Sequence, residues 1–188
     1  TAIRMSRVKI LVLGPQKAGK STIANILGDQ QEGLSSIYRP TIGCRIVDFE
    51  RDPPNSVKQF GKINVELWDV SGDFKYEKCW APMQQDVQGI MFVYDSSNPD
   101  SENDLKTFVE KFPKALGLKQ SFCQCFINPH ASENPQNVAI PACMNKLEKF
   151  VGSAEDTQGI CTTFEKYLTK LIKQLIEKQA AEENQYAS

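Results

Sequence analysis

Short runs of apolar residues alternate along the chain with longer segments in which apolar residues recur every three or four positions. The short runs are typical of strands buried in a sheet, and the longer segments are typical of helices that cover it. This order predicts an α/β fold with a mostly parallel sheet of about six strands and helices on both faces. The strands that the pattern places cover residues 8–13, 44–50, 62–68, 90–94 and 122–127.

Three segments carry a helical pattern. The first covers residues 21–27 and follows a glycine-rich turn. The second places Leu105, Phe108, Val109 and Phe112 on one face. The last begins near Gly159 and carries an apolar stripe formed by Phe164, Leu168, Leu171 and Leu175. Residues 128–141 between the last two helices are polar and contain prolines, so we expect a surface loop there.

The length of 188 residues suits one domain with its own core. We expect this domain over residues 7–179. A tail or vector-derived remnant over 1–6 would precede it, and a flexible tail over 180–188, which lacks apolar periodicity, would follow it. We find no internal repeat and expect a monomer when the protein is isolated.

Composition excludes several classes of function. The 22 basic and 23 acidic side chains leave a formal charge of −1, so no basic field is present to hold nucleic acid. The six cysteines form no Cys-x-x-Cys pair, and we expect reduced thiols in the cytoplasm. No apolar run approaches the roughly 20 residues of a membrane helix. Because no cysteine follows Cys161, we also expect no direct membrane anchor.

Residues 14–21 read GPQKAGKS and fit the phosphate-binding pattern G-x-x-x-x-G-K-[ST]. In such a P-loop, backbone N–H groups and a helix N-terminus surround phosphate oxygens. Lys20 would reach the β- and γ-phosphates, and Ser21 would ligate Mg²⁺. The alternative is a tight turn without a ligand, but a lysine in the first helical turn opposes the helix dipole unless an anion is present. The nucleotide-binding candidates are Gly14, Pro15, Gln16, Lys17, Ala18, Gly19, Lys20, Ser21 and Thr22.

Two further motifs resemble the switch regions of Rab-like small GTPases in the Ras superfamily. RPTIG at residues 39–43 resembles switch I, and LWDVSG at residues 67–72 resembles the strand that leads into switch II. Each alone could be an ordinary turn, but with the P-loop they follow the family's order and spacing. The resemblance implies a P-loop small-GTPase fold that binds GTP or GDP with Mg²⁺.

The resemblance also assigns roles to residues of the switches. It implies that Thr41, together with Ser21, ligates Mg²⁺ and that Asp69 holds the metal through a water. It further implies that the backbone N–H of Gly72 meets the γ-phosphate. The switch I loop would then become ordered when a triphosphate is bound.

The residue after Gly72 departs from the family. The family usually carries Gln there, which orients the attacking water, whereas this chain carries Asp73. An ionised carboxylate cannot donate a hydrogen bond and would lie close to the negative γ-phosphate. We therefore expect the catalytic position to be inactive, with intrinsic hydrolysis below the roughly 3–5 × 10⁻⁴ s⁻¹ of a Gln-bearing member.

The motif that reads guanine also departs from the family. In place of Asn-Lys-x-Asp the chain has NPHA at residues 128–131, and losing the bidentate carboxylate should cost about 1–3 kcal/mol of base binding. Glu155 replaces a usual Lys, although the backbone N–H of Ala154 could still meet guanine O6. His130 is either a surface-loop residue or a substitute that stacks on the base. The base contacts that the resemblance implies are Asn128, His130, Ser153, Ala154 and Glu155.

The segment GDFKYEKCW at residues 72–80 is similar to one in the Rab-like 5 family of the intraflagellar transport B complex. This resemblance implies a subunit of the complex in the cytoplasm and in the cilium or flagellum and its base. It also implies docking of the switch regions on a coiled-coil heterodimer, with Phe74, Tyr76 and Trp80 as candidate contacts. The alternative for Phe74 and Trp80 is packing beneath switch II as core.

Three accounts of the function stay open at this point. The first is a nucleotide-dependent binding module with very slow or no hydrolysis of its own. The second is a conventional cycling GTPase for which a partner supplies the group that Asp73 cannot. The third is a scaffold that keeps the fold but needs no nucleotide.

Overall fold

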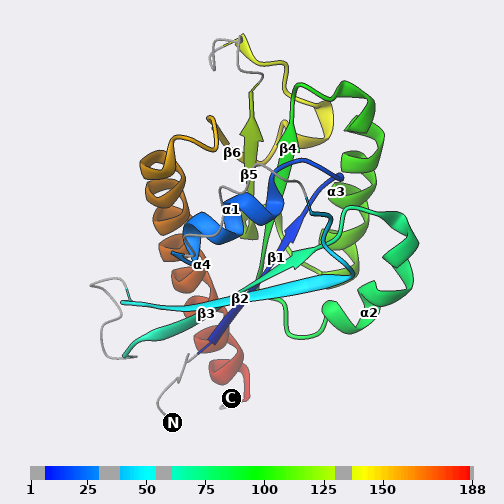
Figure 1. The fold of residues 1–188 in the computed structure, drawn as a ribbon. Helices are drawn as coiled ribbons and strands as arrows, with labels where there is room; N and C mark the ends of the chain where they lie inside the picture. The colour runs from blue at the N-terminus through cyan, green and yellow to red at the C-terminus, as the bar shows by residue number, and fades with distance from the viewer. Residues whose placement is uncertain (1–6, 30–38, 54–60, 130–136, 187–188) are drawn as a thin grey trace.

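The computed structural model describes residues 7–29, 39–53, 61–129 and 137–186. Six strands form one sheet in the order β2-β3-β1-β4-β5-β6 (Figure 1). Neighbouring strands are parallel except β2 and β3, which pair antiparallel. The predicted α/β class and mostly parallel sheet are thus confirmed. The strands are β1 (Arg7–Leu13), β2 (Cys44–Arg51), β3 (Ile63–Val70), β4 (Gly89–Asp95), β5 (Cys123–Asn128) and β6 (Glu148–Val151).

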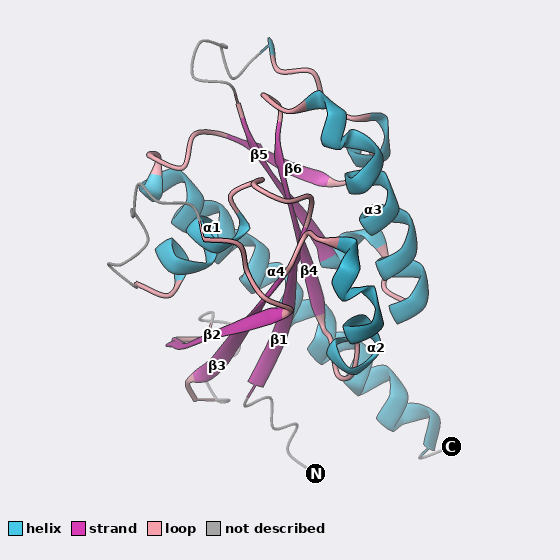
Figure 2. Cartoon of the chain, turned by 45° about the vertical axis from the view of Figure 1, so that its right-hand side comes forward, coloured by secondary structure: helices cyan, strands magenta, loops and turns pink. Residues whose placement is uncertain are grey.

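Helices cover both faces of the sheet, as predicted. The helices α1 (Lys20–Leu27) and α4 (Thr157–Tyr186) lie on one face, and α2 (Trp80–Met83) and α3 (Glu102–Leu116) lie on the other (Figure 2). Short 3₁₀ helices connect these elements, namely η3 (Phe74–Cys79), η4 (Pro99–Ser101), η5 (Gln120–Phe122) and η7 (Ala142–Met144). No helix in the described ranges is long and apolar enough to cross a membrane.

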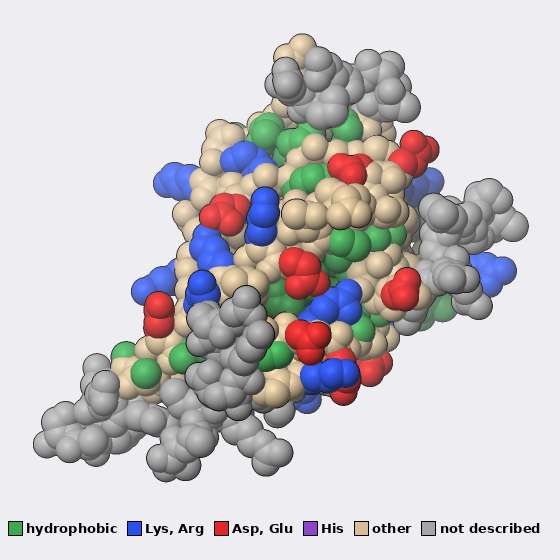
Figure 3. All heavy atoms as spheres, turned by 90° about the vertical axis from the view of Figure 1, so that its left-hand side faces the viewer, with side chains coloured by type: hydrophobic (Ala, Val, Ile, Leu, Met, Phe, Trp, Pro, Cys, Tyr) green, Lys and Arg blue, Asp and Glu red, His purple; other side chains and the backbone are tan. Residues whose placement is uncertain are grey.

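The core consists of two apolar layers, one on each face of the sheet. Side chains of β1 alternate between them: Ile10 and Val12 pack toward α1 and α4, whereas Leu11 and Leu13 pack toward α2 and α3. The apolar faces predicted for α3 and α4 are buried, including Phe108 and Phe164. On the surface that carries α1 and α4, acidic and basic side chains are interspersed (Figure 3).

Tyr167 ties α4 to the middle of the sheet. Its buried hydroxyl donates to the backbone oxygen of Phe122 at 2.9 Å and lies 3.3 Å from that of Ile90. Gly89 makes room for this hydroxyl, since a Cβ at that position would lie 2.3 Å from the Tyr167 oxygen. One side chain therefore holds β4, the start of β5 and the last helix together.

The end of the chain differs from the sequence prediction. Helix α4 continues through Tyr186, whereas we expected a flexible tail from residue 180. Leu175 and Ile176 still pack on the core, and the residues that follow are mostly Glu, Lys, Gln and Ala, which favour the helix once it has started. The predicted tail over 1–6 lies outside the described residues.

Candidate functional site

The P-loop connects β1 to α1 and requires glycine at both ends. Gly14 has φ +148°, and a Cβ there would lie 2.0 Å from the backbone oxygen of Val93 in β4. Gly19, which precedes α1, has φ +94°, a left-handed conformation that favours glycine. The loop therefore lies at the carboxyl edge of β1 and β4, where open α/β sheets bind ligands.

Lys20 points back into the P-loop. Its side chain is buried, and Nζ donates to the backbone oxygens of Gly14 at 2.9 Å and Pro15 at 2.6 Å. Burial lowers the pKa of Lys20 to about 8, although the negative charge of Asp69 opposes this shift. An ammonium in such a place gains from any anion that reaches the loop, which fits the role predicted for it.

Three elements bring polar oxygens together beside the P-loop. Ser21 at the start of α1 donates from Oγ to Asp69 Oδ2 at 2.6 Å, and its Oγ lies 3.0 Å from Thr41 Oγ1. Thr41 Oγ1 is itself 3.4 Å from the same carboxylate oxygen. The structure thus assembles the three predicted Mg²⁺ residues from α1, the segment before β2, and β3.

The chemistry of these three residues fits Mg²⁺. Asp69 is fully buried, and its Oδ1 has no hydrogen-bond partner among the described residues, so one carboxylate oxygen is left for a cation or a cation-bound water. Burial raises the pKa of Asp69, while the hydrogen bond from Ser21 and the charge of Lys20 oppose that shift. No group of three or more His, Cys, Asp or Glu side chains in the described ranges is placed so that it could hold a metal ion. Hydroxyl and carboxylate oxygens suit Mg²⁺ better than softer metals.

Gly72 lies directly against the P-loop. A Cβ on Gly72 would be 2.4 Å from the backbone nitrogen of Gln16 and 2.4 Å from the backbone carbon of Pro15. Such distances cannot be reached without a shift of one backbone. The segment after β3 therefore closes on the phosphate loop only because residue 72 has no side chain.

The carboxylate of Asp73 is engaged by the backbone and the side chain of Lys75. It accepts a hydrogen bond from the backbone nitrogen of Lys75 at 3.0 Å and pairs with Lys75 Nζ at 2.8 Å. These contacts lower the pKa of Asp73. Asp73 is thus the N-cap of η3, a role that sequence reasoning did not assign to it.

A mainly apolar pocket lies beside the P-loop, between the end of β5 and the segment before α4. Ala18 and Gly19 of the P-loop, Asn128 at the end of β5 and Ala154 before α4 line it. The aromatic rings of Phe126 and Phe150, 5.9 Å apart, form part of the wall.

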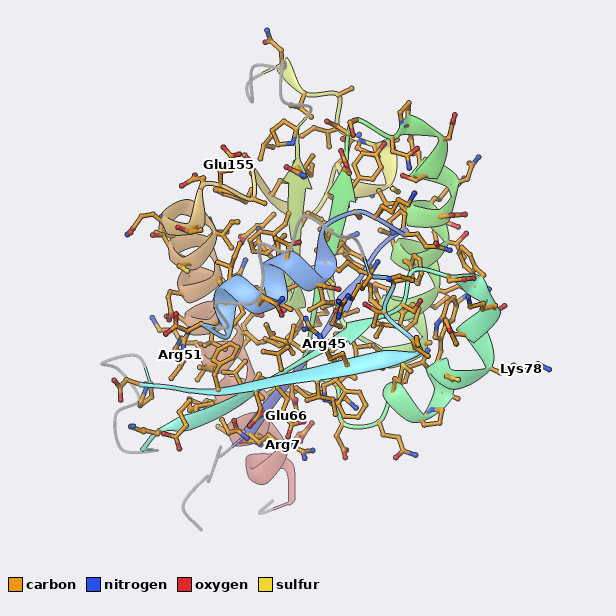
Figure 4. All side chains as sticks on the ribbon, in the orientation of Figure 1. Arg7, Arg45, Arg51, Glu66, Lys78 and Glu155 are labelled. Atoms are coloured by element: carbon orange, nitrogen blue, oxygen red, sulfur yellow. The ribbon has the colours of Figure 1, made fainter. Side chains whose placement is uncertain are left out.

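The loop before α4 is organised by its own hydrogen bonds. Ser153 Oγ accepts from the backbone nitrogen of Glu155 at 3.1 Å, and neither residue lines the pocket. Glu155 is exposed near the start of α4 (Figure 4). Of the predicted base contacts, Asn128 and Ala154 therefore reach the pocket, Ser153 and Glu155 do not, and His130 lies outside the described residues.

The aromatic candidates for partner binding are mostly packed within the molecule. Trp80 is only 5% exposed, and its ring centroid lies 5.4 Å from that of Phe108 and 5.0 Å from that of Phe112. Phe74 stacks on Phe108 at 5.3 Å. The exposed-interface interpretation is therefore wrong for Trp80, and the packing alternative holds for it and for Phe74. Tyr76 is partly exposed.

Two apolar side chains near the switch motifs, Ile42 and Ile46, are exposed, and the sequence pattern did not predict this. Ile42 is 78% exposed and Ile46 is 49% exposed, and among the described large hydrophobic residues these two stand out. Ile46 lies opposite Trp68 in the β2–β3 pair. The alternation of apolar and polar residues in β2 could have indicated Ile46, because it falls on the opposite face from the buried Val47.

Arg45 is a further residue of the site that sequence reasoning missed. It lies on β2 directly opposite Asp69, and its Nη2 is 3.5 Å from Asp69 Oδ2 and 3.3 Å from the backbone oxygen of Ser21. Figure 4 shows Arg45 between β2 and α1. Only the register of the two strands, which a single sequence does not give, brings these residues together.

Comparison with known proteins agrees with the switch motifs. The model of the ADP-ribosylation factor family matches residues 2–178. The chain is 32% identical over 182 residues to intraflagellar transport protein 22 homolog of Danio rerio, covering 95% of this chain and 97% of that protein. It is 29% identical to the Homo sapiens homolog over the same share of each chain. It is 33% identical over 117 residues to intraflagellar transport protein 22 of Chlamydomonas reinhardtii, covering 62% of this chain and 58% of that protein.

Proposed function

Because the chain belongs to the ADP-ribosylation factor family of small GTPases, and within it to the relatives named intraflagellar transport protein 22, we propose that it is a nucleotide-dependent binding module of intraflagellar transport. It would bind GTP or GDP with Mg²⁺ and serve as a subunit of the B complex that assembles the cilium or flagellum. Its place would be the cytoplasm, the organelle and the base of the organelle.

The convergence of Ser21, Thr41 and Asp69 beside a complete P-loop carries this proposal. Mg²⁺, when bound, would supply positive charge to the phosphate oxygens. Lys20 adds a second charge from inside the loop, and Gly72 lets the backbone after β3 approach the same place. The segment that carries Thr41 would respond to a bound nucleotide, because Thr41 lies directly before β2 and its hydroxyl can bond to Ser21 of the P-loop.

Slow hydrolysis follows from the position of Asp73. Its carboxylate caps η3 and pairs with Lys75, so the residue offers no donor to position a water. GTP would therefore persist on the isolated protein, and the bound nucleotide would act as a lasting signal to partners rather than as a substrate in rapid turnover.

For the partner surface, we propose the exposed residues around the switches. Ile42 and Ile46 present apolar area, and Tyr76 adds a partly exposed aromatic ring. Apolar and aromatic anchors within a polar rim suit the helices of a coiled-coil heterodimer. Phe74 and Trp80 would support this surface from beneath rather than touch the partner.

A nucleotide-independent scaffold is the second candidate, and one observation favours it. Ser21 donates to Asp69, and Lys20 donates to P-loop carbonyls, so the polar groups of the site are largely satisfied by one another. Apart from Asp69 Oδ1, these side-chain groups need no ligand to complete their hydrogen bonds.

The test begins with identification of the nucleotide that co-purifies with the protein, by denaturation and chromatography, followed by competition of GTP against ATP with Mg²⁺. Lys20→Ala and Ser21→Asn should abolish both nucleotide binding and capture of the coiled-coil heterodimer. Lys114→Ala, which removes an exposed lysine of α3, is the matched control and should retain both. Capture of the partner by nucleotide-free Lys20→Ala would favour the scaffold.

A further inference from the structure

Arg45 is placed at the metal site by the pairing of two strands. In the antiparallel β2–β3 ladder the residue opposite Arg45 is Asp69, and the residue opposite Val47 is Leu67 on the same face. Directly opposite residues on one face have Cβ atoms about 4.5–5.5 Å apart, so the two side chains must meet. The juxtaposition is therefore a property of the backbone register.

The contacts of Arg45 join the two sides of the site. Its Nη2 lies 3.5 Å from Asp69 Oδ2, the oxygen that also accepts from Ser21, and 3.3 Å from the backbone oxygen of Ser21. The Arg45 side chain is 40% exposed, whereas that of Asp69 is fully buried. Lys20 also places a positive charge near Asp69, but its ammonium donates to carbonyls of the P-loop, whereas Arg45 forms an ion pair with the carboxylate itself.

We propose that Arg45 is the built-in counter-cation of Asp69 and that it competes with Mg²⁺ for this carboxylate; the competition rests on the nucleotide site proposed above. A buried carboxylate needs a nearby positive charge, and Arg45 supplies one when no metal is present. Two cations beside one carboxylate repel each other, so the guanidinium weakens the binding of the metal. The contacts of Arg45 thereby join β2 to β3 and to the start of α1 without Mg²⁺, and these elements depend less on the metal.

A double-mutant cycle tests the ion pair without any nucleotide. Melting temperatures are measured in EDTA, after removal of nucleotide, for the wild type, Arg45→Gln, Asp69→Asn and the double variant. Arg45→Gln should lower the melting temperature by about 2–4 °C. In the Asp69→Asn background, Arg45→Gln should lower the melting temperature by less than half as much. An equal decrease in melting temperature in both backgrounds would overturn the assignment of Arg45 as counter-cation.

A Mg²⁺ titration tests the competition. The release of a fluorescent GDP analogue is followed at rising Mg²⁺ for the wild type, Arg45→Gln, Arg45→Lys and Arg51→Gln. Arg51 is the matched control, because it lies on the same strand and face but bonds to the backbone oxygen of Leu27 and to Glu165. The Mg²⁺ concentration for half-maximal slowing of release should fall about three- to tenfold in Arg45→Gln. It should stay close to the wild-type value in Arg45→Lys and Arg51→Gln.

The outcomes separate this inference from the proposed function. An unchanged Mg²⁺ midpoint in Arg45→Gln would overturn the competition while leaving the nucleotide site intact. Failure of every variant, the wild type included, to retain the GDP analogue at any Mg²⁺ concentration would overturn the nucleotide site and the competition with it. In that case the cycle in EDTA still decides whether Arg45 balances Asp69.

Discussion

At the scale of single residues, the carboxylate of Asp73 serves as a helix cap at a position where other family members place a catalytic Gln. The side chain that follows Gly72 can either cap η3, the helix that comes next in the chain, or reach back toward the proposed phosphate site. Asp73 does the former, because its carboxylate accepts from the backbone nitrogen of Lys75 and pairs with the Lys75 ammonium. The contacts that order the start of η3 are thus the same ones to which the proposed slow hydrolysis is attributed.

We predict that Asp73→Gln raises single-turnover GTP hydrolysis toward the roughly 3–5 × 10⁻⁴ s⁻¹ of Gln-bearing family members. Gln can donate to a water but is a poorer N-cap, so this variant should lose about 0.5–1 kcal/mol of unfolding free energy. Asp73→Asn is the control: it keeps the cap without the charge and is too short to position the water, so its rate should stay near that of the wild type. Equal rates in all three proteins, measured by phosphate release, would mean that residue 73 does not limit hydrolysis.

The predicted site residues that the structure brings together include two from one continuous motif. Lys20 and Ser21 follow from the P-loop pattern, because the loop and the helix start are local structures. Arg45 could not be found in this way, because its contact with Asp69 depends on the register of β2 against β3. The exposure of Trp80 was also misjudged, because aromatic residues serve cores and interfaces alike and only the packing distinguishes them.

At the scale of elements, the segment formed by η3 and α2 is held by aromatic packing on α3. Its own helices are too short to be stable alone. The rings of Phe74 and Trp80 contact Phe108, and Trp80 also contacts Phe112. The segment formed by η3 and α2 is therefore attached to α3, while Gly72, which precedes it, lies against the P-loop.

We expect Trp80→Ala to cost about 3–5 kcal/mol of unfolding free energy, because it leaves a cavity between α2 and α3. The melting temperature should fall by about 8 °C or more. Tyr76→Ala is the control: it removes a partly exposed ring from the same segment and should stay within about 0.5 kcal/mol of the wild type in chemical denaturation. If Trp80→Ala instead kept the wild-type stability and lost only partner capture, Trp80 would be an interface residue after all.

Elements with strong periodicity could be predicted and those without it could not. The buried faces of α3 and α4 and the alternation in β3 were evident from the sequence. Strand β6 was not, because its four residues include only two partly buried ones and it is recognisable mainly as the parallel partner of β5. The end of α4 was placed too early, since its last turns rely on helix propensity rather than on an apolar stripe.

At the scale of the whole molecule, Tyr167 connects elements that are distant in sequence. We predict that Tyr167→Phe lowers the unfolding free energy by about 1–3 kcal/mol, because the backbone oxygens of Phe122 and Ile90 lose a buried donor. The measurement is chemical denaturation at equilibrium. Tyr76→Phe is the matched control and should stay within about 0.5 kcal/mol of the wild type. An unchanged stability of Tyr167→Phe would show that water or another donor satisfies both oxygens.

The contribution of α4 to the core also bears on how the protein is made on the ribosome. The apolar layer beneath α1 and the P-loop includes Phe164, Tyr167 and Leu171, which are synthesised about 100 residues after Gly72. Translation proceeds at roughly 5–20 residues per second, so the strands on this face lack the cover of α4 for about 5–20 s. The strands that precede α4 in the chain therefore stay uncovered on this face during that interval, and chaperones have that time in which to bind them.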